Sequence, residues 1–431
     1  MKFPTATLSD LASSEKGSIS MGPFGSRMKA DVYVEAGVPV IRGTNIGKGR
    51  RLKGDWVYVT NKFADGISNC IVRAGDLVFP HRGSIGEVAI IPKGSERIVL
   101  SSSMMKIRVD NSKCNPLFLY YFFKADMGRN EILRFGSQVG TPGIGQPLTS
   151  LRQFTTPLPD LAIQNEIAVL LAVLDDKIEL NRKMNEVLEG MARAVFRDWF
   201  VDFGPTRRKM AGEVDPLKIL GGAIASHPQA QKTAALFPDR LGKNGLPEGW
   251  EESDLGSICK ILDNKRIPLS KRERQKRKGH IPYHGATSVM DHVDDFIFDG
   301  IFLLIGEDGS VAKENGNPFS QYVWGKIWVN NHAHVLEGTK VSTETLKCFF
   351  DQMNILPFIT GAVQLKLNQK NMKSIPFILA DTSVNKAFGE FISPLFANIR
   401  LNAEENQTLA EMRDLLLPKL MSGEIRLREG G

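Results

Sequence analysis

Apolar residues recur with a helical period in two long stretches of the chain. In the first, the spacing alternates between four and three residues, through Ile167, Leu171, Leu174, Ile178, Asn181, Asn185, Leu188, Ala192, Val195 and Trp199. Adding 221 gives a second series: Phe388, Ile392, Leu395, Ile399, Asn402, Asn406, Leu409, Arg413, Leu416 and Leu420. A mean period of about 3.5 residues is typical of a coiled-coil seam. We therefore predict two long helices, roughly 50 Å each, that pair along these seams.

The two asparagines of each seam restrict how the helices can pair. A buried seam Asn fixes the register when it meets a hydrogen-bonding partner. In an antiparallel pair Asn181 faces Asn406 and Asn185 faces Asn402, because both pairs of numbers sum to 587. A parallel pair would match Asn181 with Asn402 equally well, so the seam leaves the direction open. The antiparallel register also sets Ile178 by Leu409, Leu188 by Ile399, and Leu174 by Arg413 as an imperfect layer.

Short motifs outside the helices also occur twice and in the same order. Ser9-Asp10-Leu11 recurs as Ser253-Asp254-Leu255, and LVFPHRGSIGEVAI (77–90) is echoed by IFLLIGEDGSVAK (301–313). β-Branched and aromatic runs alternate with Gly, Asn and Asp turns in both copies, which favours an α+β fold. We predict an internal repeat with these boundaries: first module 1–156, first helix 157–203, linker 204–249, second module 250–376, and second helix with C-terminal tail 377–431. Pro394 and Pro418 are expected to kink or fray the second helix.

Composition indicates an ordinary globular protein. The chain has 431 residues, of which 42% are hydrophobic and 24% charged, and this argues against wholesale disorder. Its four cysteines lie far apart and form no C-x-x-C pair, which excludes a zinc ribbon and makes a disulfide framework unfavourable. The first residues lack the apolar core of a signal peptide, and no apolar run is long enough to span a bilayer. We expect a soluble chain in the reducing cytoplasm.

The net charge of +7 is concentrated in one segment. Residues 260–280 contain nine bases and two acids, so this window carries the whole excess and the remaining chain is neutral. A smaller basic cluster lies between Arg42 and Gly54 in the first module. Such runs suit the neutralisation of phosphates, which dominates nucleic-acid affinity. A solvated loop or helix face is the alternative interpretation of either run alone.

Several short motifs match the sequences of known catalytic sites but lack the other motifs that such sites require. Residues 115–118 (Asn-Pro-Leu-Phe) resemble an adenine-methyltransferase loop, yet no Gly-rich unit for a methyl donor accompanies them. Residues 159–160 and 175–177 have nuclease-like spacing, but the second group falls on the predicted helix and favours surface charge. Asp-Phe-Gly at 202–204 has no kinase motifs around it, and the H-x-H at 332–334 has no acidic or Cys companion at ligand spacing. We predict that this chain carries out no chemistry.

The chain resembles the specificity subunit of type I DNA restriction-modification systems over essentially its whole length. The first half carries the resemblance in GPFGSRMK (22–29), GVPVIRGTNI (37–46), PLPDLAIQNEI (157–167) and RDWFVDFGP (197–205). ALFPDRL (235–241) and LPEGW (246–250) follow, and the second half adds IPYHGATSVMDHVDDFIFDG (281–300), LLIGEDGS (303–310) and WVNNHAHVL (328–336). PFILADTSVNKAF, before the second helix, departs from the expected lead-in.

The resemblance implies two target-recognition domains that read the halves of a split, asymmetric DNA sequence, held apart by an antiparallel coiled coil. It also implies two modification subunits, which methylate adenine at N6 with S-adenosylmethionine, and restriction subunits that use ATP and Mg. This chain is then expected to hold no catalytic residue, cofactor or metal, and to have no membrane partner. The rival functions are a self-contained DNA methyltransferase or nuclease with a cryptic site, and a coiled-coil interaction protein that binds no DNA.

Basic residues in such an interface mostly position the DNA backbone, while polar loop residues read base edges. The phosphate candidates are Arg42, Lys48, Arg50 and Arg51 in the first module, and Lys271, Arg272, Arg274, Lys276, Arg277 and Lys278 in the second. The candidates for base or groove contacts lie on Gly-bearing loops: Arg82, Gly83, Ser84, Tyr283, His284, Gly285, Ala286, Thr287, Gly361, Val363 and Gln364. An ordinary turn is the alternative for each loop residue.

Overall fold

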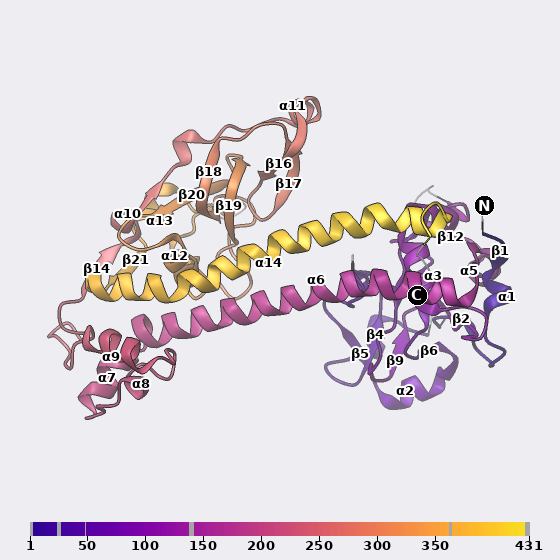
Figure 1. Cartoon of the computed structure of the whole chain (residues 1–431), viewed down its shortest axis with the longest axis horizontal. Helices are drawn as coiled ribbons and strands as arrows, with labels where there is room; N and C mark the ends of the chain where they lie inside the picture. Colours follow the sequence, from indigo (N-terminus) through magenta and orange to yellow (C-terminus); the bar gives the residue numbers. More distant parts are fainter. Residues whose placement is uncertain (1–2, 24–26, 48, 138–141, 362–363, 427–431) are drawn as a thin grey trace. The chain divides into compact units, whose positions relative to one another are not determined.

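A computed structural model describes residues 3–23, 27–47, 49–137, 142–361 and 364–426. The chain divides into two compact units, Met1–Asn181 with Glu404–Gly431, and Arg182–Ala403. Each unit contains one α+β domain and part of each long helix (Figure 1). These domains are called domain 1 and domain 2 below. The predicted α+β class with two modules is confirmed.

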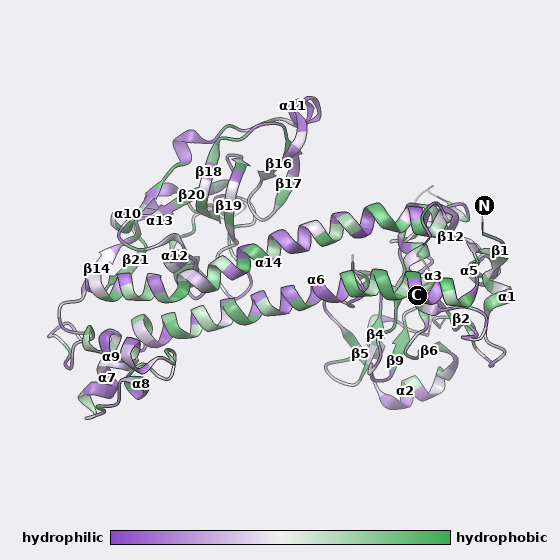
Figure 2. Cartoon of the chain, viewed as in Figure 1, coloured by the Kyte–Doolittle hydropathy of each residue, from purple (hydrophilic) through white to green (hydrophobic). Residues whose placement is uncertain are grey.

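The predicted helices are α6 (Leu161–Phe196), which continues into the π-helical turn Arg197–Val201, and α14 (Thr382–Ser422). Within the first unit Asn181 Nδ2 donates to Asn406 Oδ1 at 3.1 Å, and within the second unit Asn402 Nδ2 donates to Asn185 Oδ1 at 2.8 Å. Both pairs belong to the antiparallel register, so that prediction is confirmed and the parallel alternative is wrong. Figure 2 shows apolar and polar residues alternating along both helices.

The prolines that were expected to kink or fray the second helix do not end it, because α14 continues as helix through Pro394 and Pro418. A helical proline removes one backbone donor and crowds the preceding turn. Buried neighbours compensate for this at both places: Ile392 and Phe396 flank Pro394, and Leu417 and Leu420 flank Pro418. Packing of the apolar face thus outweighs the local cost.

Domain 1 contains two main sheets. The five-stranded sheet has the order β3 (Tyr33–Val34), β5 (Val57–Val59), β4 (Val38–Ile41), β9 (Ile98–Leu100) and β6 (Ile71–Val72). The four-stranded sheet has the order β2 (Ile19–Met21), β10 (Met104–Ile107), β7 (Leu77–Pro80) and β8 (Ala89–Ile90). The pairs β1 (Thr5–Thr7) with β13 (Thr155–Pro157) and β11 (Gly136–Ser137) with β12 (Gly143–Ile144) complete the strands. The helices are α1 (Leu8–Leu11), α2 (Asn61–Gly66), α3 (Pro116–Lys124), α4 (Asp126–Leu133) and α5 (Pro147–Gln153).

The main core of domain 1 is continuous with the long helices. The aromatic side chains of α3 pack against Phe79 of β7, with the Phe79 and Phe123 ring centroids 5.2 Å apart. Ile167 and Leu171 of α6 and Leu420 of α14 belong to the same buried cluster. Domain 1 is therefore held to its helices by shared hydrophobic burial, the dominant favourable contribution to packing.

Domain 2 is built around one six-stranded sheet. Its order is β15 (Cys259–Ile261), β20 (Ala333–Gly338), β18 (Phe298–Gly306), β19 (Ser320–Val329), β16 (Lys278–His284) and β17 (Val289–Val293). β14 (Glu251–Asp254) pairs with β21 (Pro376–Leu379). The helices are α10 (Leu255–Ile258), α11 (Lys271–Lys276), α12 (Thr343–Phe350) and α13 (Gln369–Lys373).

The strand pairings confirm the internal repeat. β4 runs parallel to β9 in domain 1, as β16 runs parallel to β19 in domain 2. One proposed correspondence is wrong, because Ser9-Asp10-Leu11 lies within α1 whereas Ser253-Asp254-Leu255 spans the end of β14 and the start of α10. Thr7 is the N-cap of α1 and Asp254 is the N-cap of α10. Asp254 is therefore structurally equivalent to Thr7, three residues before Asp10, with which the sequence match had paired it.

The segment 204–249, interpreted above as a linker, is folded. It forms α7 (Gly204–Met210), α8 (Pro216–Ile219) and α9 (His227–Ala235). Phe237 packs edge-on against Trp199 with ring centroids 5.0 Å apart, and Phe388 of α14 lies 5.6 Å from the same ring. Gly, Pro and Ala therefore mark short helices and tight turns here, not an extended connection.

No helix in the described residues is both long and apolar enough to cross a membrane. All four cysteines are buried as free thiols. Burial raises the pKa of Cys114 and Cys259 to about 12, so both remain protonated and unreactive at neutral pH.

Candidate nucleic-acid interface

Domain 2 gathers several loops at one end of its sheet. They comprise residues 285–288 after β16, 307–310 after β18, 330–332 between β19 and β20, and 364–367 before α13. Asn330 N donates to His284 O at 3.1 Å, which joins the first and third loops. Leu367 N donates to Glu307 O at 2.9 Å, which joins the second and fourth. We call this the loop end of domain 2.

Domain 1 has an equivalent loop end, formed by residues 42–45, 81–84, 101–103 and 142–144. Ser101 N donates to Ile41 O at 3.0 Å, as Asn330 does to His284. Gly83 N donates to Pro142 O at 2.8 Å, and Gly83 has a φ of +80°, which favours glycine. The repeat has therefore placed the same set of loops together in both domains.

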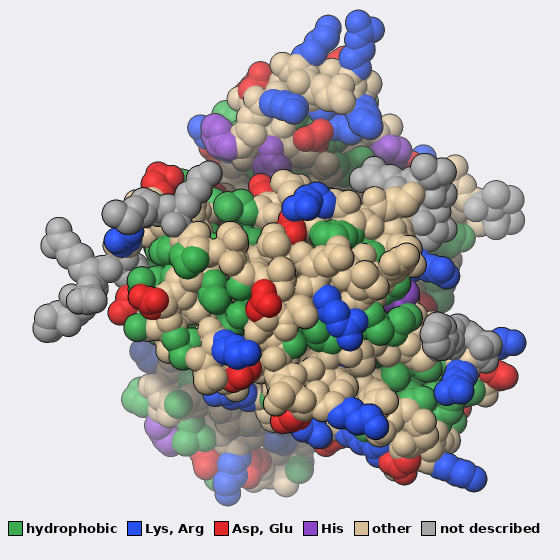
Figure 3. All heavy atoms as spheres, turned by 90° about the vertical axis from the view of Figure 1, so that its right-hand side faces the viewer, with side chains coloured by type: hydrophobic (Ala, Val, Ile, Leu, Met, Phe, Trp, Pro, Cys, Tyr) green, Lys and Arg blue, Asp and Glu red, His purple; other side chains and the backbone are tan. Residues whose placement is uncertain are grey.

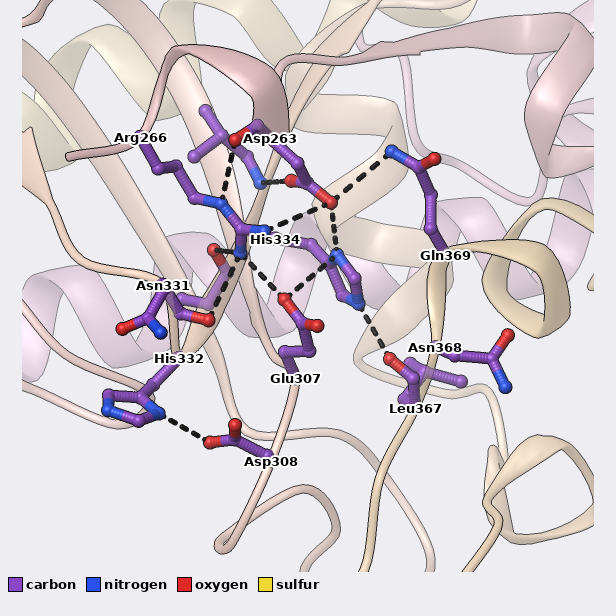
Figure 4. A network of polar contacts seen from close by, with 12 residues as sticks. Asp263, Arg266, Glu307, Asp308, Asn331, His332, His334, Leu367, Asn368 and Gln369 are labelled. Carbon is purple, nitrogen blue, oxygen red and sulfur yellow. Dashed lines mark hydrogen bonds and ion pairs between the residues drawn. The ribbon is translucent and has the colours of Figure 1, made fainter. Parts of the chain in front are cut away.

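A polar network holds the loop end of domain 2 together from beneath (Figure 4). Arg266 Nη1 pairs with Glu307 Oε2 at 2.7 Å and donates to Ala333 O at 2.6 Å. Asp263 Oδ1 accepts from Val335 N at 3.0 Å. His334 lies between, with Nδ1 2.6 Å from Asp263 Oδ2 and Nε2 2.7 Å from Leu367 O. The network thus ties the loop segments to β20.

The charge of Asp263 follows from these partners. Burial alone would raise the pKa of Asp263, but hydrogen bonding to His334 and the charges of His334 and Arg266 lower it, so the carboxylate is ionised. The Asp263 carboxylate and the Leu367 carbonyl thus lie on either side of the His334 ring.

The H-x-H motif has no acidic companion at ligand spacing in the sequence, but the fold brings acidic side chains to both histidines. His332 lies 2.6 Å from Asp308, and Asp263, Glu307 and His334 place possible metal-ligand atoms within 4.8 Å of one another. These partners come from distant positions and had no local spacing to reveal them. Arg266 already pairs with both carboxylates, so these contacts form a structural polar network.

Most of the predicted base-contact residues lie at the loop ends. Arg82, Gly83, Ser84 and Thr287 are exposed there, as are Gly361 and Gln364, and Gly285 and Ala286 form the adjoining turn. Tyr283 and His284 do not share this exposure. Tyr283 Oη accepts from Leu269 N at 2.9 Å, and burial lowers the pKa of His284, which contacts Gln321. These two side chains support the turn from beneath, and Val363 lies outside the described residues.

The second basic cluster divides into partly buried arginines that support the hairpin and exposed cations. Arg274 lies over the Tyr283 ring at 5.1 Å and pairs with Asp291, while Arg277 lies over Trp328 at 4.7 Å and pairs with Asp294. These contacts anchor α11 to the β16–β17 hairpin. The remaining cations are exposed and form no ion pair with any described residue: Lys271, Arg272, Lys276 and Lys278. Figure 3 shows blue side chains standing out at the top of the view, where Figure 1 places α11.

These exposed cations and the loop end flank the same hairpin at opposite ends. Lys278 begins β16 and His284 ends it. At about 3.3 Å per residue the two ends lie roughly 20 Å apart. The charged segment and the predicted base-reading turn are therefore separate parts of domain 2.

The first basic cluster, predicted to contact phosphate, forms ion pairs with the long helix. Arg50 pairs with Asp176 and approaches Asp175, and Arg51 Nη1 pairs with Glu179 Oε1 at 3.0 Å. All three carboxylates belong to α6. Arg42 Nη2 donates to Asp55 O at 2.6 Å and shapes its own loop. Arg50 and Arg51 thus hold domain 1 to its helix, although the Arg51 side chain is still 52% exposed, and Lys48 lies outside the described residues.

The motifs with catalytic letters have structural roles. Asn115 is the N-cap of α3, and its Oδ1 accepts from Leu117 N at 2.8 Å. Asp175 is not a surface charge, as the helix position suggested, because it is buried and accepts from Tyr121 Oη at 2.9 Å and Arg413 Nη1 at 2.8 Å. Arg413 thereby satisfies the layer opposite Leu174 that looked imperfect. Phe203 has a φ of 52° and starts the turn into α7.

A second apolar face of α6 is exposed. Its members recur at intervals of three, four or seven residues: Val169, Val173 and Leu180 in the first unit, and Met184, Val187 and Met191 in the second. Each is at least 46% exposed, although the other seam of the helix is occupied by α14. Exposed apolar side chains at this regular spacing form a stripe, which is an unusual feature for the surface of a helix.

These features define a class of protein in which two equivalent α+β domains, each with a cluster of loops at one sheet end, are carried by two antiparallel helices. Residues 7–190 and 247–411 match the type I restriction modification DNA specificity domain. The chain belongs to this family.

Two relatives show the likeness over nearly the full length. The type I restriction enzyme MjaIX specificity subunit of Methanocaldococcus jannaschii is 25% identical over 394 residues, covering 86% of this chain and 82% of the relative. The HindI specificity subunit of Haemophilus influenzae is 23% identical, covering 82% and 87%. The crystal structure of the S subunit from M. genitalium aligns over 97% of this chain and 96% of its own, with a TM-score of 0.55 and 15% identity. That structural likeness supports the fold.

Proposed function

We propose that the chain is the DNA-recognition subunit of a type I restriction-modification complex and binds a bipartite, asymmetric target. The observation that carries this proposal is the duplicated loop end, because two equivalent but differently composed surfaces suit two different half-sites. Arg82 of domain 1 corresponds to Asp308 of domain 2, since each forms the equivalent bridge, to Gly143 and to Lys366. A cation and an anion at the same position would select different base edges.

We further propose that the chain contributes recognition and no chemistry. S-Adenosylmethionine would belong to the modification subunits, and ATP and Mg to the restriction subunits. The structural roles of Asn115 and Asp175 support this, because neither side chain is available as part of a methyltransferase or nuclease site. The reduced, buried cysteines suit a cytoplasmic complex.

The exposed stripe of α6 supports a scaffolding role for the chain. Helices of two modification subunits would pack against this stripe, and restriction subunits would then join the complex. Replacing Val173 and Leu180 with Asp should abolish copurification with the modification subunit, because each change places a charge in an apolar helix contact. Glu166→Asp, an exposed position on the same helix, is the matched control and should leave copurification unchanged. Unaltered copurification of the Val173 and Leu180 variant would exclude this surface.

Sequencing of methylated adenines in a host carrying the complex tests the bipartite target. Exchange of residues 1–150 for another module should change only one half-site. A change in both halves would contradict the assignment of one domain to each half. Methyl transfer by the purified chain alone would instead support a self-contained enzyme.

The exposed α11 cations supply a second test of DNA binding. Replacing Lys271, Arg272, Lys276 and Lys278 with Gln should lower the salt dependence of duplex affinity by about 0.9 for each phosphate that is no longer neutralised, or about 3–4 in total. Lys386→Gln, a similarly exposed cation on α14, is the control. An intact complex that binds no duplex would favour the coiled-coil protein without a DNA role.

A further inference from the structure

The repeat places a docking point at the same position on each long helix. In the first unit these positions are Asp175 and Glu179 of α6. Asp175 accepts a hydrogen bond from Tyr121 of α3 at 2.9 Å, and Glu179 pairs with Arg51 at 3.0 Å. The Tyr121 hydroxyl and the Arg51–Glu179 ion pair thus join domain 1 to its helix at adjacent turns, beside the pairs of Arg50 with Asp175 and Asp176.

Adding 221 to these numbers gives Phe396 and Arg400 of α14, in the second unit. The Phe396 ring packs edge-on against the Tyr322 ring of β19, with centroids 5.0 Å apart. Arg400 hydrogen-bonds the Tyr322 hydroxyl and pairs with Glu344 of α12 at 3.5 Å, while Tyr322 donates to Glu344 at 2.8 Å. Domain 2 is therefore also joined to its helix by one tyrosine and one ion pair.

The two docking points have opposite charge. At the first docking point, Glu179 of α6 supplies the carboxylate and Arg51 of domain 1 supplies the guanidinium. At the second, Arg400 of α14 supplies the guanidinium and Glu344 of domain 2 supplies the carboxylate. If domain 2 were docked on α6, Glu344 would meet Glu179. If domain 1 were docked on α14, Arg51 would meet Arg400. Like charges at such a contact repel each other and destabilise the docked arrangement. The repulsion should be stronger at Arg400, because Arg400 and Glu344 are largely shielded from water.

We propose that the positions 175/179 and 396/400 set the orientation of each recognition domain on its helix, and that their opposite charges make each accept only its own domain. The inference rests on the proposed function, because the orientation of a domain decides where its loop end meets the DNA. The charged members, Glu179, Arg51, Arg400 and Glu344, are then positioning residues that control the spacing between half-sites without touching a base.

Charge reversal in the full chain tests the docking directly. Glu179→Arg or Arg51→Glu alone should speed amide exchange at the interface of domain 1 with α6 by about fivefold, the upper range for an exposed ion pair. Combining the two changes should restore protection. Arg400→Glu and Glu344→Arg should behave alike in domain 2, with a larger effect of about tenfold because that pair is less exposed. Glu166→Arg, which reverses an exposed charge elsewhere on α6, should leave exchange unchanged.

The spacing of methylated sites provides the readout that a purely structural role would not change. Single reversals should admit targets whose spacer is altered by a base pair, with both half-site sequences retained, and the paired reversals should return the original spacing. Unchanged spacing in the single variants, or no recovery in the double variants, would overturn the proposal. A wild-type complex that methylates no bipartite site would refute the proposed function, and exchange in the chain alone would still decide the docking points.

Discussion

Removal of the His334 side chain should loosen the loop end of domain 2. His334 lies on β20 with 1% of its side chain exposed, and its ring nitrogens contact Asp263 and the Leu367 carbonyl. His334→Ala removes the ring that contacts the Asp263 carboxylate and leaves the Leu367 carbonyl without this hydrogen-bond partner. The loop segments on both sides of the ring lose their common partner.

The loss of stability in His334→Ala depends on the contacts that Asp263 keeps. Leaving a buried polar group without its hydrogen-bond partner costs about 1–3 kcal/mol, and more for a charged group such as the Asp263 carboxylate. Asp263 keeps the bond from Val335 N and lies 3.6 Å from Arg266, which reduces the loss. We therefore expect a destabilisation of about 2–3 kcal/mol, which includes the cost of an unsatisfied buried acceptor. A surface pair would contribute much less.

Native-state hydrogen exchange on the full chain measures this locally. The amides of Val335 and Leu367, which donate to Asp263 and Glu307, should lose protection by about 30- to 150-fold, since about 1.4 kcal/mol corresponds to tenfold. His332→Ala is the matched control, because the His332 side chain is 49% exposed and its pair with Asp308 should contribute under about 1 kcal/mol. Unchanged exchange in His334→Ala, or an equal loss in the control, would refute the reasoning.

The sign of the pH dependence follows from the lowered pKa of Asp263. A carboxyl whose folded pKa is depressed stabilises the fold above its ordinary value and loses that contribution as pH falls through the folded value. The difference in unfolding free energy between the wild type and Asp263→Asn should therefore be full at neutral pH and shrink below about pH 4. A difference that grew on acidification would contradict the assigned charges.

Three further changes test other parts of the structure by urea unfolding of the full chain. Asn181→Leu should cost about 1–2 kcal/mol because it leaves Asn406 without its seam partner, and adding Asn406→Leu should recover most of the loss. Asp175→Ala should cost about 2–4 kcal/mol, since it leaves a buried tyrosine hydroxyl and a partly buried guanidinium unpaired; a cost under about 0.5 kcal/mol would show that the junction is solvated. Arg274→Ala should cost about 1–2 kcal/mol because it removes a ring contact and a carboxylate pair, whereas Lys276→Ala should stay within about 0.5 kcal/mol.

The features that could be predicted from the sequence are periodic or repeated. The seam spacing defined both long helices, and the paired asparagines at 181 and 406 gave the register that the antiparallel arrangement adopts. Repetition of glycine-bearing loops located the loop ends, because equivalent turns must follow equivalent strands. Pro394 and Pro418 show the limit of local preference, since burial of their apolar neighbours keeps the helix continuous.

What the sequence could not predict depends on long-range charge pairing. Arg50 and Lys271 each lie in a basic run and cannot be told apart from the sequence. Arg50 nevertheless contacts Asp175 and Asp176, which lie 125 and 126 residues later in the chain, whereas Lys271 remains exposed. The same holds for His334, whose partner Asp263 lies 71 positions earlier. Nothing in the local spacing distinguishes these cases, because a base pairs with whatever acid the fold brings to it.

Sorting the cations by partner alters the expected electrostatics of the two halves. The segment 260–280 carries the whole net excess of +7, and the cations left exposed in it belong to domain 2. In domain 1, Arg50 and Arg51 are neutralised by α6 carboxylates. Phosphate neutralisation governs the salt dependence of binding, whereas loop contacts govern the choice of bases. If the chain binds a bipartite target as proposed, the half-site bound by domain 2 should therefore supply more of the salt-dependent affinity, and the half-site bound by domain 1 should rely more on its exposed loops.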